Sequence, residues 1–172
     1  MAQYRSSFVA AGKPTPSSGW ANQLQTAWAT YEVATAPAAN DTLVMCKLPK
    51  GAMIVGGRLI TERLASGTSA GSASLGVNIG VDMKVYTNAG VSVATTSTSN
   101  CLGTFGPLDY AAVTGVKPES GVNMPLGGLL YSEGPLRLSD NGNAYITFSS
   151  SATSFVTGQL TLEVDFVVSE IS

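Results

Sequence analysis

Apolar and polar residues alternate with a period of two along several segments of this chain, a pattern typical of β-strands that bury one face. The alternation is most regular over residues 73–81 and 158–168. In the second segment, the apolar side chains of one face are Leu160, Leu162, Val164, Phe166 and Val168. The polar side chains between them point the opposite way, so both segments are predicted to be strands with one face in a core.

Further strands are predicted from stretches rich in β-branched and aromatic residues, at 28–35, 42–48, 52–61 and 144–150. A Pro-Lys-Gly turn follows Leu48. An Asn-Gly pair at 141–142 supplies the positive φ values that a tight hairpin needs. Adjacent glycines at 56 and 57 predict a bulge, or a place where another backbone approaches closely.

Helical periodicity is nearly absent. No segment of ten or more residues repeats its apolar positions every 3.6 residues, and we expect at most a short helical turn near residues 20–27. Residues 128–140 predict a hairpin at Ser-Glu-Gly-Pro or a bent strand. Seven to nine strands with regular turn signals indicate an all-β fold, an antiparallel jelly roll or β-sandwich over residues 28–172, with a loop-rich insertion around 83–128.

Residues 1–27 differ from the rest of the chain. They contain several prolines, glycines and serines, so they cannot bury enough apolar surface for a core of their own. We predict an extended N-terminal arm that becomes ordered by lying on a partner, or else a disordered leader. Its candidate contacts with a partner are the four separated apolar side chains Tyr4, Phe8, Trp20 and Leu24.

Charge and catalytic residue types are scarce. Nine basic and eleven acidic residues give a net charge of −2, without the basic stripe that nucleic acid or a membrane surface would require. The chain has no histidine, which removes the commonest general base and metal ligand. We therefore expect no enzyme, no catalytic residues, no cofactor and no nucleic-acid or membrane partner. The low charge favours a surface covered by a partner, or an ordinary neutral β-domain.

Two sites with acidic residues could carry chemistry. Asp140 and Asn143 flank a turn that loosely resembles a calcium loop, but the later glutamate is missing, so a hairpin turn is favoured over a metal site. Glu163 and Asp165 share one strand face at a separation of about 6–7 Å, which would suit paired carboxylates of a glycosidase. Their position on a polar face favours a solvated surface instead.

Cysteines and aromatic residues leave two further alternatives. Cys46 lies in an apolar run, so we expect Cys46 and Cys101 to be free thiols, with a disulfide as the alternative. Aromatic side chains could line a sugar-binding groove, as in a carbohydrate-binding domain, although scattered aromatics in β-domains more often belong to a core or an interface. These residues are Trp20, Trp28, Tyr31, Tyr86, Tyr110 and Tyr131.

Three motifs carry a resemblance to a known family. They are the run from Tyr31 to Asp41 (Y-x-V-x-x-A-x-A-x-N-D), the run Leu48–Leu59 (L-P-K-G-A-x-I-V-x-G-x-L) and the closing strand Gly158–Val168. The likeness covers the two ends of the β-domain. The chain resembles the cement, or decoration, proteins of tailed bacteriophages, which are jelly-roll virion proteins encoded beside the major capsid protein. The middle of the chain, including residues 106–128, departs from the shorter relatives.

The resemblance implies a structural virion protein that binds the outside of a capsid and stabilises the shell. It implies the major capsid protein as partner, self-association as a homodimer or homotrimer with the dimer preferred, and synthesis in the host cytoplasm. The N-terminus also lacks a long apolar signal-like run. The alternative function is a β-sandwich of a tail fibre or baseplate that binds host glycans.

Overall fold

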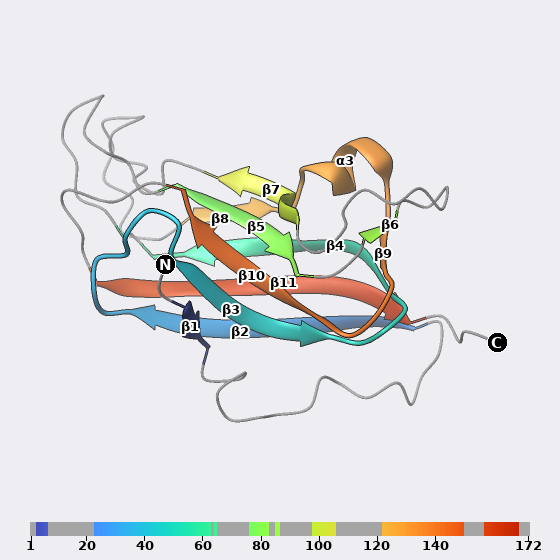
Figure 1. Ribbon diagram of the computed structural model, residues 1–172, viewed down its shortest axis with the longest axis horizontal. Helices are drawn as coiled ribbons and strands as arrows, with labels where there is room; N and C mark the ends of the chain where they lie inside the picture. Colours follow the sequence, from blue (N-terminus) through green and yellow to red (C-terminus); the bar gives the residue numbers. More distant parts are fainter. Residues whose placement is uncertain are drawn as a thin grey trace.

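The structure of the protein is a computed structural model, and it describes residues 3–6, 23–62, 64, 76–82, 85–86, 98–105, 122–149 and 157–168. These residues form two β-sheets packed face to face, with β3, β10 and β5 crossing obliquely over β4, β11 and β2 (Figure 1). The predicted all-β jelly-roll or β-sandwich fold is confirmed.

The first sheet, sheet A, has five strands, in the order β1 (Gln3–Arg5), β3 (Thr42–Leu48), β10 (Gly142–Phe148), β5 (Val77–Val81) and β7 (Thr98–Phe105). The second, sheet B, has the order β2 (Leu24–Val33), β11 (Gly158–Val168), β4 (Ala52–Thr61), β9 (Leu136–Leu138) and β6 (Val85–Tyr86), while β8 (Val122–Pro125) also pairs with β4. The described strand pairs are antiparallel except β1 with β3, which is parallel.

The core lies between the two sheets and is built by the alternation that the sequence shows. In β11 the side chains of Leu160, Leu162, Val164 and Phe166 are fully buried, while the residues between them are half-buried on the other face. Val77, Ile79 and Val81 of β5 are also fully buried. The largest fully buried side chains from the rest of the chain are Phe148, Leu43, Met45, Leu48, Ile54, Leu59, Leu64 and Leu102.

The two adjacent glycines of β4 have different surroundings. The register of β4 against β11 shifts between Asp165 and Phe166, where Gly56 and Ile54 are the successive partners, so Val55 is the extra residue of a β-bulge. At Gly57, φ is +137°, and a Cβ added there would lie 2.2 Å from the carbonyl oxygen of Glu163. The predictions of a bulge and of a close backbone approach are therefore both confirmed.

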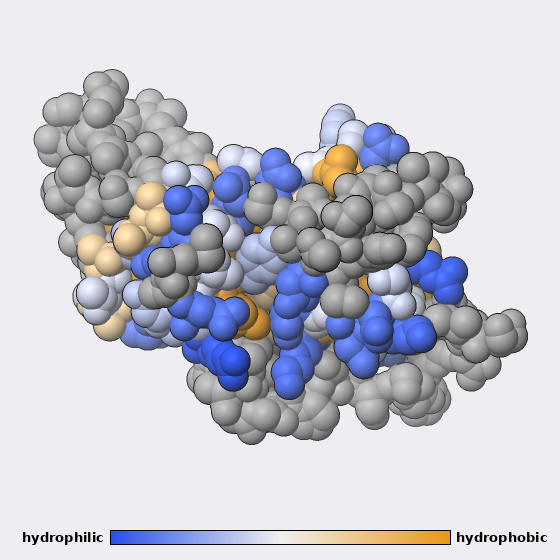
Figure 2. Space-filling view, viewed as in Figure 1, coloured by the Kyte–Doolittle hydropathy of each residue, from blue (hydrophilic) through white to orange (hydrophobic). Residues whose placement is uncertain are grey.

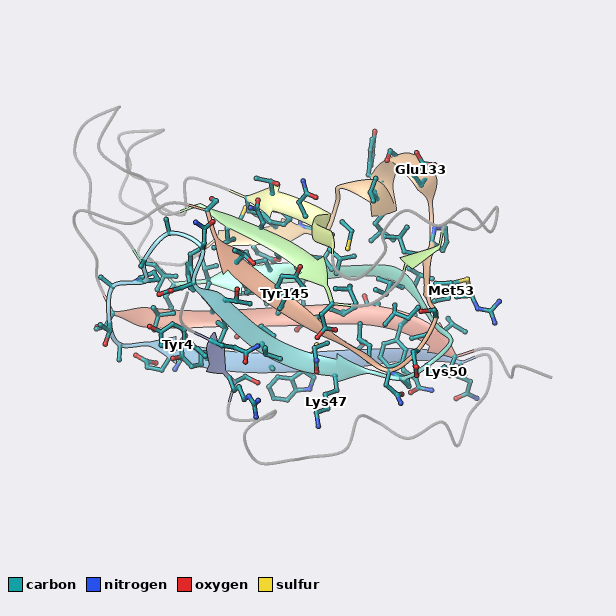
Figure 3. All side chains as sticks on the ribbon, viewed as in Figure 1. Tyr4, Lys47, Lys50, Met53, Glu133 and Tyr145 are labelled. Atoms are coloured by element: carbon teal, nitrogen blue, oxygen red, sulfur yellow. The ribbon has the colours of Figure 1, made fainter. Side chains whose placement is uncertain are left out.

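The Pro-Lys-Gly turn that joins β3 to β4 is a corner between the two sheets. The Lys50 amide donates to Asn141 Oδ1 at 3.0 Å, and the Gly51 amide donates to the carbonyl of Leu138 at 3.2 Å. Gly51 has φ +75°, which favours glycine at the corner. The Pro-Lys-Gly turn and the Asn-Gly turn are thus hydrogen-bonded to each other at one end of the sandwich, where Figure 3 labels Lys50.

Two local predictions were wrong. The Asn-Gly pair at 141–142 does not close a hairpin, because β9 before it lies in sheet B and β10 after it lies in sheet A, and neither of the two residues has a positive φ. Residues 128–140 do not form a hairpin or a bent strand but a short helix, α3 (Leu129–Glu133), followed by β9. Gly128 and Gly134 flank this helix with φ values of +62° and +79°, which start and stop it. Near residues 20–27 the sequence allows at most a short helical turn; residues 24–27 are instead the first residues of β2 and pair with β11, and residues 20–22 lie outside the described residues.

Candidate interaction surfaces

Of the four predicted contact residues, the two that the structure describes lie on different sheets. Tyr4 lies in β1 on sheet A, and Leu24 begins β2 on sheet B, where 64% of it is exposed. Phe8 and Trp20 lie outside the described residues. In the predicted arm of residues 1–27, the described residues at the start therefore lie on sheet A and those at the end lie in sheet B. Residues 7–22 between them remain a predicted contact segment.

Tyr4 packs against its own sandwich. Its ring centroid is 6.2 Å from that of Tyr31, with the planes tilted by 51° (Figure 3 labels Tyr4). The neighbouring Ser6 is buried, and its hydroxyl donates to the carbonyl of Met45. The pKa of the Tyr31 hydroxyl is raised, mainly by its burial and to a smaller extent by the nearby Tyr4. Residues 3–6 are thus held on the sheet edge by a parallel strand pair, a buried hydrogen bond and an aromatic contact.

The outer face of sheet B holds polar side chains that pair with one another. Arg58 binds Glu163 through two nitrogens, as a hydrogen bond and an ion pair. The pKa of the Arg58 guanidinium is raised, mainly by its hydrogen bond to Glu163 and next by the negative charge of Glu163. Thr26 donates to Asp165 at 2.6 Å. Both acidic residues considered for glycosidase chemistry are therefore engaged on a polar sheet face, as the favoured interpretation predicted.

The same face also exposes large apolar side chains. Trp28 of β2 is 56% exposed, and Val55 of the β4 bulge is 38% exposed. Because the neighbouring polar groups already have partners on the face, covering it would leave few donors or acceptors unpaired. The sequence analysis did not single out Trp28 as a surface anchor. The sequence does contain a signal: Trp28 alternates with the apolar residues of β2 and so shares a strand face with the polar residues Thr26, Thr30 and Glu32.

The outer face of sheet A carries polar side chains. Figure 2 views the molecule from this side and shows mostly hydrophilic residues among those described. Thr104 donates to Asn78 at 2.9 Å across β7 and β5. A shallow groove of about 360 Å³ is lined by Lys47, Leu48, Asn141, Gly142 and Asn143. Lys47 points away from the sandwich beside it (Figure 3).

The turn at Asp140 is not arranged as a calcium loop. Asn143 directs its backbone and side-chain nitrogens to the two carboxylate oxygens of Asp82, at 2.5 and 2.7 Å, and Asp140 accepts from the Asn141 amide at 2.7 Å. Within the described ranges, no group of three or more His, Cys, Asp or Glu side chains could hold a metal ion. None of the helices described there is both long and apolar enough to cross a membrane.

Aromatic side chains do not form a row on one sheet among the described residues. Trp28 lies on the outer face of sheet B, Tyr31 is half-buried on the opposite face of the same strand, and Tyr131 is 91% exposed on α3. A groove that stacks a sugar needs such a row. The described geometry gives no support to the sugar-binding alternative.

Both cysteines are free and buried, as expected. Cys46 is in β3 and Cys101 in β7, with β10 and β5 between them. Three strand spacings of about 4.8 Å separate β3 from β7, more than the Cα separation of about 7 Å that a disulfide tolerates. Burial raises the pKa of Cys46 to about 12 and that of Cys101 to about 11.

We predict that both thiols resist alkylation in the folded protein at pH 8 and react fully in denaturant, as mass spectrometry of the alkylated chain would show. Because the folded state holds these protons more tightly than the unfolded chain, stability should fall as pH rises from about 9 towards the folded pKa values. Rapid native labelling of Cys46, or a Cys46–Cys101 peptide in the non-reduced protein, would contradict this.

No protein-family model matches the chain. No curated protein is similar to it in sequence. Solved structures are similar in fold. A chain of the "Capsid of Ralstonia phage GP4" has a TM-score of 0.65 and 18% identity, covering 99% of this chain and 100% of that one. A chain of the "Cyanophage Pam1 capsid asymmetric unit" has a TM-score of 0.57 and 16% identity, covering 90% and 91%. The fold is shared.

Proposed function

We propose that the protein is a structural component of a bacteriophage virion that binds the outside of the capsid and stabilises the shell, as a cement or decoration protein. The supporting observation is the full-length likeness in fold to a chain of a phage capsid structure, at a TM-score of 0.65. The sequence motifs at 31–41, 48–59 and 158–168 point independently to the same class. On this proposal the main partner is the major capsid protein.

The surface chemistry suits that role. An outer sheet face with internally paired charges and exposed apolar side chains can be covered at little desolvation cost. A shell protein also binds in many copies, so individually weak contacts add up across the array. Within this proposal, residues 7–22 supply further contacts with the shell through the large apolar side chains of Phe8 and Trp20. The described residues on either side of this segment are held on the sandwich.

The test is co-sedimentation of the purified protein with shells of its phage that have been stripped of it. We predict saturable binding by the wild type and binding weakened by roughly tenfold or more in the double variant Phe8→Ala/Trp20→Ala. Each large apolar side chain contributes about 1.5–3 kcal/mol when fully buried, and about 1.4 kcal/mol corresponds to a tenfold change.

Tyr131→Ala serves as the matched control, because it removes an exposed aromatic side chain from α3 and leaves the segment at 7–22 unchanged. All variants should melt like the wild type. Equal binding by the double variant would remove residues 7–22 from the interface. Failure of the wild type to co-sediment, or saturable binding to one class of glycan, would contradict the proposed function.

A further inference from the structure

The strand β2 lies at one edge of sheet B in the described structure. It pairs with β11 over ten successive residues, from Leu24 opposite Val167 to Val33 opposite Gly158, with no shift in register. A regular edge strand of this length offers a row of backbone N–H and C=O groups that only another strand can pair in full. β2 contains no proline, lysine or bulge, the devices that usually protect such an edge.

The other described edges are better protected. β1 has three residues and β6 has two, and β8 ends at Pro125. At β7 the backbone before α3 lies against the strand, with the Gly127 amide donating to the carbonyl of Leu102 at 2.8 Å. A Cβ at Gly128 would lie within 3.0 Å of three β7 backbone atoms. The lack of protection is therefore particular to β2.

The centre of β2 reads the same in both directions. Residues 26–30 are Thr-Ala-Trp-Ala-Thr, a palindrome about Trp28. If two copies of the strand run antiparallel about a two-fold axis at Trp28, then Thr26 faces Thr30, Ala27 faces Ala29, and Trp28 faces itself. An isologous interface needs a self-complementary patch, and Thr–Thr and aromatic pairs directly opposite each other stabilise antiparallel strands.

We propose that β2 of one copy pairs antiparallel with β2 of a second copy, centred on Trp28, and joins the two B sheets into one. The two exposed Trp28 side chains then pack together on the outer face, and the small side chains of Ala27 and Ala29 meet on the inner face, where both are buried. This inference names the surface of self-association, and it does not depend on binding to a capsid.

The test is the oligomeric state of the full chain by sedimentation equilibrium across a range of concentrations. The wild type should dimerise, and Trp28→Lys should raise the dimer dissociation constant by roughly tenfold or more, because two like charges would face each other on the edge. Val55→Lys is the matched control. It places the same charge on the same outer face but on β4, away from the edge, and should leave the dimer intact.

A cross-linking measurement fixes the register. Trp28→Cys should form a symmetric disulfide between two copies under mild oxidation, since residues directly opposite each other have Cα atoms about 4.5–5.5 Å apart. Thr26→Cys should not, because its two copies would be separated by about 13 Å along the strands.

Several outcomes would overturn the proposal. They are a monomeric wild type, a dimer unaffected by Trp28→Lys, and equal weakening by Val55→Lys, which would make the sheet face and not the edge the interface. A chain that dimerises only after residues 2–19 are deleted would show the edge to be covered by its own N-terminal segment. A monomer that still binds shells would remove this interface and leave the proposed function standing.

Discussion

Replacing Val164 with Asp is expected to eliminate soluble, folded protein. Val164 is fully buried in the middle of β11, between its strand partners Ala27 and Gly57. The change removes about 1.5–3 kcal/mol of apolar burial. It also leaves an unpaired buried charge, at a cost of about 3–5 kcal/mol. Since domains are stable by only about 5–15 kcal/mol, soluble yield and the circular dichroism melt should both collapse.

The control uses the other face of the same strand. Gln159 is exposed on β11 and lies opposite Glu32, so Gln159→Lys adds a charge where water can solvate it and where an opposite charge faces it. Its melting should stay near the wild type, within about 0.5 kcal/mol. Leu162→Asp, at another fully buried position of β11, should repeat the loss. Normal expression and melting of Val164→Asp would mean that the two faces of β11 are assigned the wrong way round.

Gly57→Ala is expected to destabilise the protein by about 3 kcal/mol or more, because a non-glycine residue at such a φ costs about 1–3 kcal/mol before any clash is counted. The clash is severe. The new Cβ would lie 2.2 Å from the Glu163 carbonyl oxygen and 2.8 Å from Leu126 Cδ1. The oxygen belongs to the backbone of β11, the strand paired with β4, so relief requires β4 and β11 to separate. Chemical denaturation monitored by tryptophan fluorescence would measure the loss.

The neighbouring glycine is the matched control. A Cβ at Gly56 would meet only Asp165 Oδ2, at 3.7 Å, an ordinary contact with a side chain. Gly56→Ala should therefore change the unfolding free energy by less than about 1 kcal/mol. If the two alanine variants unfolded alike, the close approach at Gly57 would not be the reason for the glycine there.

Local chemistry determined which strands could be predicted from the sequence. The predicted segments 42–48, 52–61 and 158–168 coincide with β3, β4 and β11, because each combines a period of two with turn residues at an end. The boundaries of β2 and the helix α3 were missed. β2 starts at Leu24 because β11 pairs with it there, and α3 depends on the fit of Gly128 against β7. Both are contacts between residues far apart in sequence.

The candidate surfaces were less predictable than the strands. The apolar character of Tyr4 marks it as an anchor, but only the fold shows that Tyr31 of its own domain is its neighbour. The alternation in β2 places Trp28 on the polar face, yet no local pattern tells an edge strand from a central one. The order of strands in a sheet arises from pairings across the whole chain, so the exposed edge of β2 came from the structure.

The position of β11 in sheet B has a consequence for synthesis. β11 lies between β2 and β4, and it is the last of the described strands to leave the ribosome. Until it emerges, β2 has no strand partner among the described strands of sheet B, and β2 and β4 lack the strand that lies between them. The pairing joins Leu24 to Val167 across nearly the whole described chain, a long-range contact of the kind that slows folding. Sheet B can therefore close only once β11 has left the ribosome, and a nascent chain cut short before residue 158 would keep aggregation-prone edges open.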